Sequence, residues 1–223
     1  MAAYYTTAKM VDLIELYVNK FNNDEKEVLN ASRPLLTALL NRGQLEVVGL
    51  MDRRNLDILD VVDTSKALDA TGDFAFSGLT STVYNGAESI DAVKISGASG
   101  KYCLYKDFDE YKDMVNADHT FSASAPICYF RGEKVHVEPN SGVSTSIDVY
   151  YMKTPTAHVD GSGTPTAFSQ PVLEIIIEYT AHLAFDYLQN PKMSEIALTH
   201  AILSMNRMNE KQIIIDEKEA GLD

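Results

Sequence analysis

The chain has 223 residues, of which 45% are hydrophobic, and a formal net charge of −13 at pH 7. This length suits one large domain or one domain with an insertion, and the hydrophobic share is ordinary for a soluble globular protein. The acidic residues are spread singly along the chain, so the charge argues against tight nonspecific binding to nucleic acid. No secretory signal and no run of membrane-spanning length is recognisable, so we expect synthesis in a cytoplasm and no membrane partner.

Two helical segments are predicted at the start of the chain. Residues 7–21 carry apolar side chains at helical spacing, which indicates an amphipathic helix. Residues 24–41 predict a second helix that is interrupted at Pro34 and ends at Gly43. The following stretch, 44–73, is ambiguous, because aliphatic residues with isolated acids between them fit either strands or short helices.

The middle of the chain is predicted to be rich in β-strands. Residues 74–105 are enriched in glycine, serine and threonine with recurring β-branched residues, and they contain strand-like runs at 92–95 and 101–105. Residues 107–116 then predict a short helix, for which Asp107 is a suitable N-terminal cap.

The sequence PICYFRGEKVHVEP, at 126–139, predicts a tight β-hairpin. Gly132 and Glu133 suit a two-residue turn, because a glycine at the first position supplies the positive φ that the turn requires. The resulting register sorts the apolar side chains of both strands onto one side. The predicted opposing pairs are Phe130 with Val135, Cys128 with Val137, and Tyr129 with His136. The alternating residues of 146–155 predict a third strand in the same sheet.

The C-terminal third predicts a helical hairpin after a polar loop. The loop, 156–170, has few apolar residues and several glycines and prolines, so we expect it to be exposed and mobile. A long helix follows from Pro171 to about Leu188, and a last helix begins near Met193 after the turn at Asn190-Pro191.

These elements predict an α+β fold, in which a helical bundle built from the N- and C-terminal helices carries an inserted antiparallel β-rich region. The expected helical core comprises residues 1–73 and 171–209. The β-rich insertion comprises 74–155, and a C-terminal tail comprises 210–223.

The tail contains Ile213, Ile214 and Ile215, three consecutive β-branched residues between charged neighbours. A consecutive run does not fit one face of a helix, and it favours an extended segment. Two interpretations stay open: the isoleucines cover the subunit's own core, or they bind a partner. They are the candidate partner-binding residues.

One line of polar residues is a candidate site. Glu174, Glu178, His182 and Asp186 recur every four residues, so they share one face of the long helix. Acids and a histidine in this arrangement suit a metal site or an acid–base pair. The rest of the helix is apolar, however, and a mostly buried helix needs one solvated stripe. We therefore predict a solvated stripe, with no catalytic, cofactor-binding or metal site, and a protein that is not an enzyme.

A resemblance to a known family is carried by three stretches: PICYFRGEKVHVEP (126–139), SIDVYYMKTP (146–155) and QPVLEIIIEYTAHLAFDYLQNP (170–191). A hairpin, a Tyr-Tyr-x-Lys-x-Pro ending, a polar loop and a buried helix closing on Asn-Pro follow in that order. This layout resembles the head-to-tail connector proteins of tailed bacteriophages, also called adaptor, neck or ring proteins. It is most similar to the portal-proximal ring proteins of crAss-like phages, over roughly residues 90–209.

The resemblance implies a structural virion protein of the neck or tail region, assembled in the host bacterial cytoplasm. It implies a homo-oligomeric ring, usually a dodecamer, that binds the portal protein and further tail or ring proteins. Genomic DNA passes through such a ring without specific binding. The family has no cofactor, and its C-terminal segment commonly docks onto the portal.

Two other function classes stay open at the level of sequence. One is a metal-dependent enzyme that uses the stripe at 174–186. The other is a tail or receptor-binding module, in which the β-rich middle binds a ligand.

Overall fold

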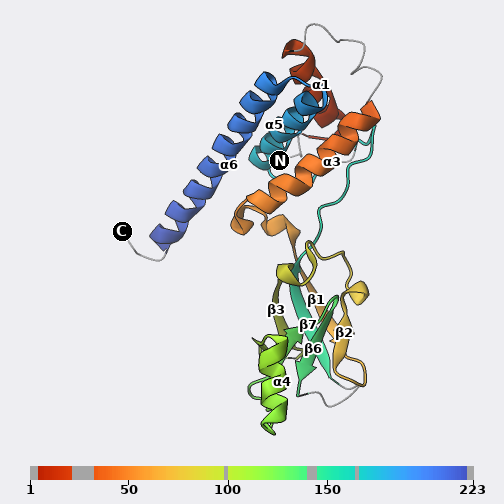
Figure 1. The fold of residues 1–223 in the computed structure, drawn as a ribbon, viewed down its shortest axis with the longest axis vertical. Helices are drawn as coiled ribbons and strands as arrows, with labels where there is room; N and C mark the ends of the chain where they lie inside the picture. Colours follow the sequence, from red (N-terminus) through yellow and green to blue (C-terminus); the bar gives the residue numbers. More distant parts are fainter. Residues whose placement is uncertain (1–4, 22–32, 98–99, 140–144, 164–165, 220–223) are drawn as a thin grey trace. The chain divides into compact units, whose positions relative to one another are not determined.

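A computed structural model describes residues 5–21, 33–97, 100–139, 145–163 and 166–219. The chain divides into two compact units (Figure 1). The helical unit comprises residues 1–58 and 155–223, and the β unit comprises residues 59–154. The α+β fold, with helices at both ends of the chain and a β-rich insertion, is confirmed.

The described part of the helical unit has four long helices: α1 (Thr7–Phe21), α3 (Arg33–Leu50), α5 (Gln170–Tyr187) and α6 (Pro191–Glu219). Helix α5 packs against the other three, because apolar side chains surround most of its circumference and need cover on several sides. Phe185 of α5 is fully buried and meets the ring of Tyr17 edge-on at 6.1 Å between centroids. None of the described helices combines the length and apolar character needed to cross a membrane.

The predicted end of the second helix at Gly43 is wrong, because α3 continues through Gly43 to Leu50. Gly43 lies against α5, where a Cβ would stand 2.6 Å from Thr180 Oγ1. The glycine therefore permits close packing between two helices. Pro34 falls at the second residue of α3, where proline costs no helical hydrogen bond. The expected helical residues 24–32 lie outside the described residues.

Most described residues of the segment 156–170 are exposed, in agreement with the expected loop, but contacts with α3 hold part of its backbone. Asn41 of α3 binds the backbone of His158 twice: its Nδ2 donates to the carbonyl oxygen at 3.0 Å, and its Oδ1 accepts from the amide at 2.6 Å. Gln44 Nε2 donates to the carbonyl oxygen of Thr156 at 3.2 Å. His158 and Phe168 are buried. The side-chain amides of Asn41 and Gln44 thus form hydrogen bonds with backbone groups of this irregular segment and hold it against α3.

The β unit contains two sheets. The first, in the order β1-β7-β3, is antiparallel and consists of β1 (Asp60–Ala67), β7 (Ser146–Met152) and β3 (Ile90–Ile95). The second has the order β2-β6-β5-β4 and consists of β2 (Asp73–Ala75), β6 (Lys134–Glu138), β5 (Ile127–Phe130) and β4 (Leu104–Tyr105). Among the described strand pairs of this sheet, β4–β5 is the parallel one. Buried residues of both sheets share one core.

The β unit begins at Leu59, whereas the sequence placed the start of the insertion at residue 74. The reason is β1, which pairs with β7 along almost its whole length. Most of the ambiguous stretch 44–73 is thereby assigned: 44–50 completes α3, and 60–67 forms a strand.

The predicted hairpin register is confirmed. Phe130 lies opposite Val135, Cys128 opposite Val137 and Tyr129 opposite His136. Gly132 has a φ of 60°, in the left-handed region that the turn needs. The prediction of a third strand in this sheet is wrong, because β7 is the central strand of the other sheet. Its alternating apolar residues pack across the core onto the hairpin, so the same pattern serves a sandwich.

The helix predicted at 107–116 is present as α4 (Phe108–Asn116). Asp107 caps it and Glu110 completes a capping box, in which each side chain accepts from the other residue's backbone amide. The rings of Phe108 and Tyr111 lie 5.3 Å and 4.4 Å from the ring of Tyr129 in β5. This helix therefore packs on the hairpin face opposite the shared core.

Candidate functional site

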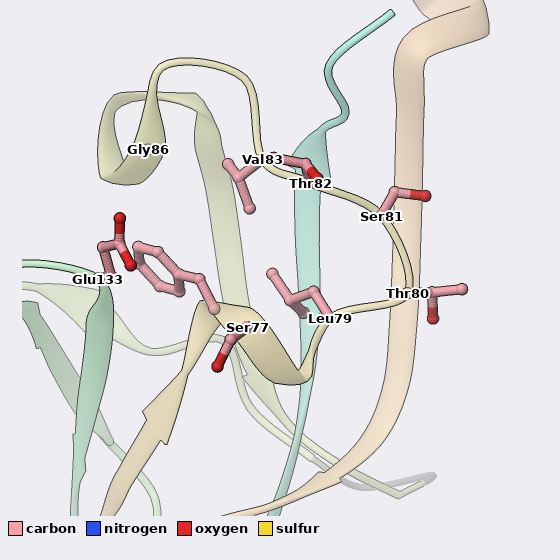
Figure 2. Close-up of a pocket in the computed structure, with 9 residues that line it drawn as sticks. Ser77, Leu79, Thr80, Ser81, Thr82, Val83, Gly86 and Glu133 are labelled. Carbon is pink, nitrogen blue, oxygen red and sulfur yellow. The ribbon is translucent and has the colours of Figure 1, made fainter. Parts of the chain in front are cut away.

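The β unit has a hollow of about 320 Å³ beside the hairpin turn (Figure 2). Its walls come from the 3₁₀ turn Phe76–Gly78, from the extended segment 79–83, from Gly86 and from Glu133. The amide of Phe76 donates to the carbonyl oxygen of Glu133 at 2.9 Å, which ties the hairpin turn to the wall. The hollow is therefore built by short 3₁₀ turns, an extended segment and a hairpin turn.

The chemistry of this hollow suits binding better than catalysis. Figure 2 shows Leu79 and Val83 on one side and Glu133 on the other, while the side chains of Thr80 and Ser81 point away. The described lining holds one carboxylate and several hydroxyl groups, without a histidine, lysine or cysteine beside them. A hydroxyl nucleophile needs an adjacent base. This hollow can hold an apolar group with a positive charge near Glu133.

A buried carboxylate supports the wall of the hollow. Asp63 of β1 is 7% exposed and accepts hydrogen bonds from the amide and the hydroxyl of Thr80, at 2.5 and 2.6 Å. The hydroxyl of Tyr151 donates to it at 3.3 Å, and Lys66 Nζ lies 3.5 Å away. Burial raises the pKa of Asp63, but the hydrogen bonds from Thr80 and the charge of Lys66 outweigh it, so the pKa lies below 3.8.

We expect Asp63→Asn to destabilise the β unit by about 1–3 kcal/mol, because the amide group cannot accept every hydrogen bond that the carboxylate accepts. Chemical denaturation checks this. Asp109→Asn is the matched control, since that side chain is 89% exposed and its loss should change stability by less than about 0.5 kcal/mol. Equal stability of Asp63→Asn and Asp109→Asn would contradict this supporting role of Asp63.

Because the folded-state pKa of Asp63 is lowered, the stabilisation that Asp63 provides is complete above pH 3.8 and is lost as pH falls through the folded-state value.

The predicted solvated stripe is only partly solvated. Glu174 and Asp186 are exposed, as expected, but the two middle residues pack against α6. Ser204 Oγ donates to Glu178 at 3.4 Å, and burial raises the pKa of Glu178. His182 Nδ1 lies 2.8 Å from Ser194 Oγ. Among the described residues no group of three or more histidines, cysteines or acids converges as a metal site would require.

Among the described histidines of the helical unit, His158 is the buried one. Its side chain is buried, its Nδ1 lies 2.9 Å from Thr7 Oγ1, and its Nε2 meets no hydrogen-bond partner among the described residues. Burial lowers the pKa of His158 below 6.5. A neutral ring fits this environment, because an imidazolium would leave a charged donor without a partner.

Lowering the pH from 7.5 to 5 is therefore expected to destabilise the helical unit. The folded-state pKa of His158 lies below the unfolded value of 6.5, so its stabilisation is complete above pH 6.5 and is lost as pH falls through the folded-state value. Thermal unfolding at several pH values checks this. His158→Gln should weaken the dependence, while His200→Gln, at an exposed position of α6, should leave it unchanged. An unaltered pH profile in His158→Gln would overturn the prediction.

The candidate residues Ile213, Ile214 and Ile215 lie within α6, so the predicted extended backbone is wrong. The flanking glutamate, lysine and glutamine residues are strong helix formers, and they continue the preceding helix. The side chains of these isoleucines lie outside the described part of the structure. Their role in partner binding stays a prediction.

The sequence reasoning missed Asp63 and the hollow. The burial of Asp63 could have been predicted, because Asp63 stands two residues after Val61 in a strand, and side chains two residues apart in a strand point to the same side. The hollow has no such signal, since its lining comes from segments separated by up to 57 positions.

Neither a scan against protein-family models nor a search of curated proteins found a match for this chain.

Proposed function

We propose that the protein is a structural component of a tailed-bacteriophage virion. It forms a ring below the portal, connects the capsid to the tail and extends the DNA channel. The ring is a homo-oligomer of twelve copies that contacts the portal protein and further tail or ring proteins. It lies in the neck of the virion after assembly in the host bacterial cytoplasm, and it does no catalysis.

The order of elements supports this proposal. The hairpin β5–β6, the strand β7, the anchored segment and the buried helix α5 follow one another as the resemblance requires. The Asn190-Pro191 turn then reverses the chain into α6. The acidic net charge of −13 agrees with a channel wall along which DNA passes without binding.

The observation that carries the proposal is the length of α6. It has 29 residues and α5 has 18, which correspond to about 43 Å and 27 Å. The contacts of His182 with Ser194 and of Glu178 with Ser204 set the register between the two helices. At that register, the first residue of α5, Gln170, lies opposite about residue 210 of α6.

The last turns of α6 therefore have no counterpart in α5. They include Ile213, Ile214 and Ile215, and short helical ends are stable in water mainly when they pack against something. A partner that receives this end explains both its helical backbone and its isoleucines. In a connector that partner is the portal.

The test is assembly with the portal protein encoded in the same genome. Full-length protein is mixed with purified portal, and the products are weighed by native mass spectrometry and imaged. The expected product is a ring of this chain bound to the portal. Protein that stays monomeric and unbound in the presence of portal would overturn the proposal.

A further inference from the structure

One edge of the β unit exposes three large apolar residues within four positions. Tyr102, Leu104 and Tyr105 are 58%, 60% and 61% exposed. We call these three residues, with Lys101, the tyrosine edge. A soluble subunit gains nothing from exposing so much apolar surface along one strand, so such a patch indicates an interaction site.

The tyrosine edge closes one side of the sandwich, because its segment pairs with both sheets in turn. The amide of Ile95 donates to the carbonyl oxygen of Lys101 at 3.0 Å, and the amide of Cys103 donates to Val93 at 2.8 Å. The amide of Leu104 then donates to Pro126 in the other sheet, also at 2.8 Å. Both sheets therefore end at the same segment on this side.

The opposite side of the first sheet ends at β1. Asp60, Val62 and Thr64 are exposed there, with Val62 at 47%. We call these three residues the β1 edge. An edge strand offers backbone donors and acceptors to a neighbouring chain, and β1 is regular from Asp60 to Asp63, before the irregularity between Asp63 and Lys66.

The two edges carry opposite charges at one exposed position each, Lys101 on the tyrosine edge and Asp60 on the β1 edge, while Asp91 on β3 and Lys66 on β1 have the other sign. Lys94, Lys101 and Lys106 lie along the side of the tyrosine edge, where Lys94 sits over the ring of Tyr102 and Lys106 pairs with Glu110. The other side carries Asp60 on β1, together with Asp69 and Asp73 at the turn into β2 and on that strand. Two different surfaces on opposite sides of one unit, with Lys101 exposed on one and Asp60 on the other, are what a head-to-tail contact needs.

We propose that the tyrosine edge of one copy packs against the β1 edge of the next copy. The occupant is a second copy of this chain, and repetition of the contact around an axis builds the ring. The inference deepens the proposed function and rests on it. It assigns the subunit contact to the β unit, with Leu104 and Tyr105 as the apolar anchors and Lys101 facing Asp60.

The first test compares two surface variants of the full-length protein in the portal assembly assay. Leu104→Glu should weaken ring formation about tenfold or more, because it places a charge in an apolar contact. Val159→Glu is the matched control, since Val159 is 68% exposed in the helical unit, and it should assemble as the wild type does. Circular dichroism verifies that both variants are folded.

The second test exchanges charges. Lys101→Asp and Asp60→Lys should each weaken ring formation, and the double variant should restore it, because the opposite charges then face each other again. Both side chains are exposed, so neither single change is expected to unfold the subunit. A double variant no better than the single ones overturns the pairing of these two edges.

The outcomes separate the two proposals. If the wild type forms rings on the portal and Leu104→Glu forms them equally well, the edge contact is wrong and the connector function stands. If the wild type forms no ring at all, both are wrong. If rings are lost in Leu104→Glu but not in Val159→Glu, and charge exchange restores them, the inference holds.

Discussion

Deletion of residues 211–223 is expected to abolish binding to the portal and to leave a folded, soluble subunit. The described contacts of α6 with the rest of the helical unit lie before the cut: Met205 is buried, and Asn209 binds the amide of Asp52 and the side chain of Asn55. The deleted segment carries the three isoleucines. Their burial would stabilise the contact by roughly 5 kcal/mol before ordering costs, so the affinity should fall by roughly a thousandfold. Titration of portal with each form measures this.

A matched pair of point variants separates the isoleucines from the charges around them. Replacing Ile213, Ile214 and Ile215 by serine should reproduce the deletion. Replacing Asp216 and Glu217 by asparagine and glutamine should leave portal binding within about tenfold of the wild type, because this change removes two charges and keeps the three isoleucines. If the truncated protein unfolds or aggregates by itself, the tail belongs to the core and the docking prediction is wrong.

Gly43→Leu is expected to destabilise the helical unit by about 3 kcal/mol, the upper end of the cost of overpacking a close contact. Even a Cβ at this position would lie 2.6 Å from Thr180 Oγ1, and Thr180 is fully buried with its hydroxyl bound to the carbonyl oxygen of Ile176 at 2.7 Å. The threonine cannot simply turn away, so α3 and α5 must separate. Urea denaturation of the variant measures the loss.

A double variant tests the reason for this loss. Gly43→Ala alone should destabilise the protein, although alanine favours helix by about 1 kcal/mol over glycine. Combined with Thr180→Ala, which removes the clashing hydroxyl, the same change should become neutral or stabilising, because the next atom, Thr180 Cα, lies 3.5 Å away. Additive costs in the double-mutant cycle would show that Gly43 is needed for some other reason.

Local features of the fold were predictable from the sequence because they depend on nearby residues. The hairpin register follows from Gly132 and the alternation around it, and α4 follows from its cap at Asp107. Helix α1 follows from a single apolar stripe. In each case a local energy term, such as a turn, a cap or a periodicity, decides the structure.

The wrong predictions concern residues whose role is set by distant partners. Gly43 resembles a helix end until Thr180, 137 positions later, occupies the space beside it. The alternation of β7 is the same whether the strand joins the hairpin or faces it, and the choice of β1 as its neighbour is made 80 to 90 residues earlier in the chain. Sequence pattern alone does not hold this information.

The candidate sites also differ in whether they depend on nearby or on distant residues. The isoleucines at 213–215 were noticed because a consecutive β-branched run is visible in the sequence. For the tyrosine edge, the sequence predicts a strand at 101–105 and does not predict its exposure. The exposure of Tyr102, Leu104 and Tyr105 depends on which sheets the segment joins. The anchoring of His158 by Asn41 joins residues 117 positions apart, so the sequence pattern of the loop does not predict it.

The division of the chain sets an order for folding during synthesis. The β unit is continuous, from residue 59 to 154, and the amide of Lys153 closes it by donating to the carbonyl oxygen of Leu59 at 2.9 Å. It can therefore fold as soon as it leaves the ribosome. Helices α1 and α3, although made first, must wait for α5, which supplies most of their apolar cover. Before α5 is made, the folded β unit already holds the two ends of a 96-residue insertion together. The chain that joins α3 to α5 is therefore effectively much shorter. Docking of α5 onto α3 then costs less loop-closure entropy than it would with an unfolded linker of 96 residues.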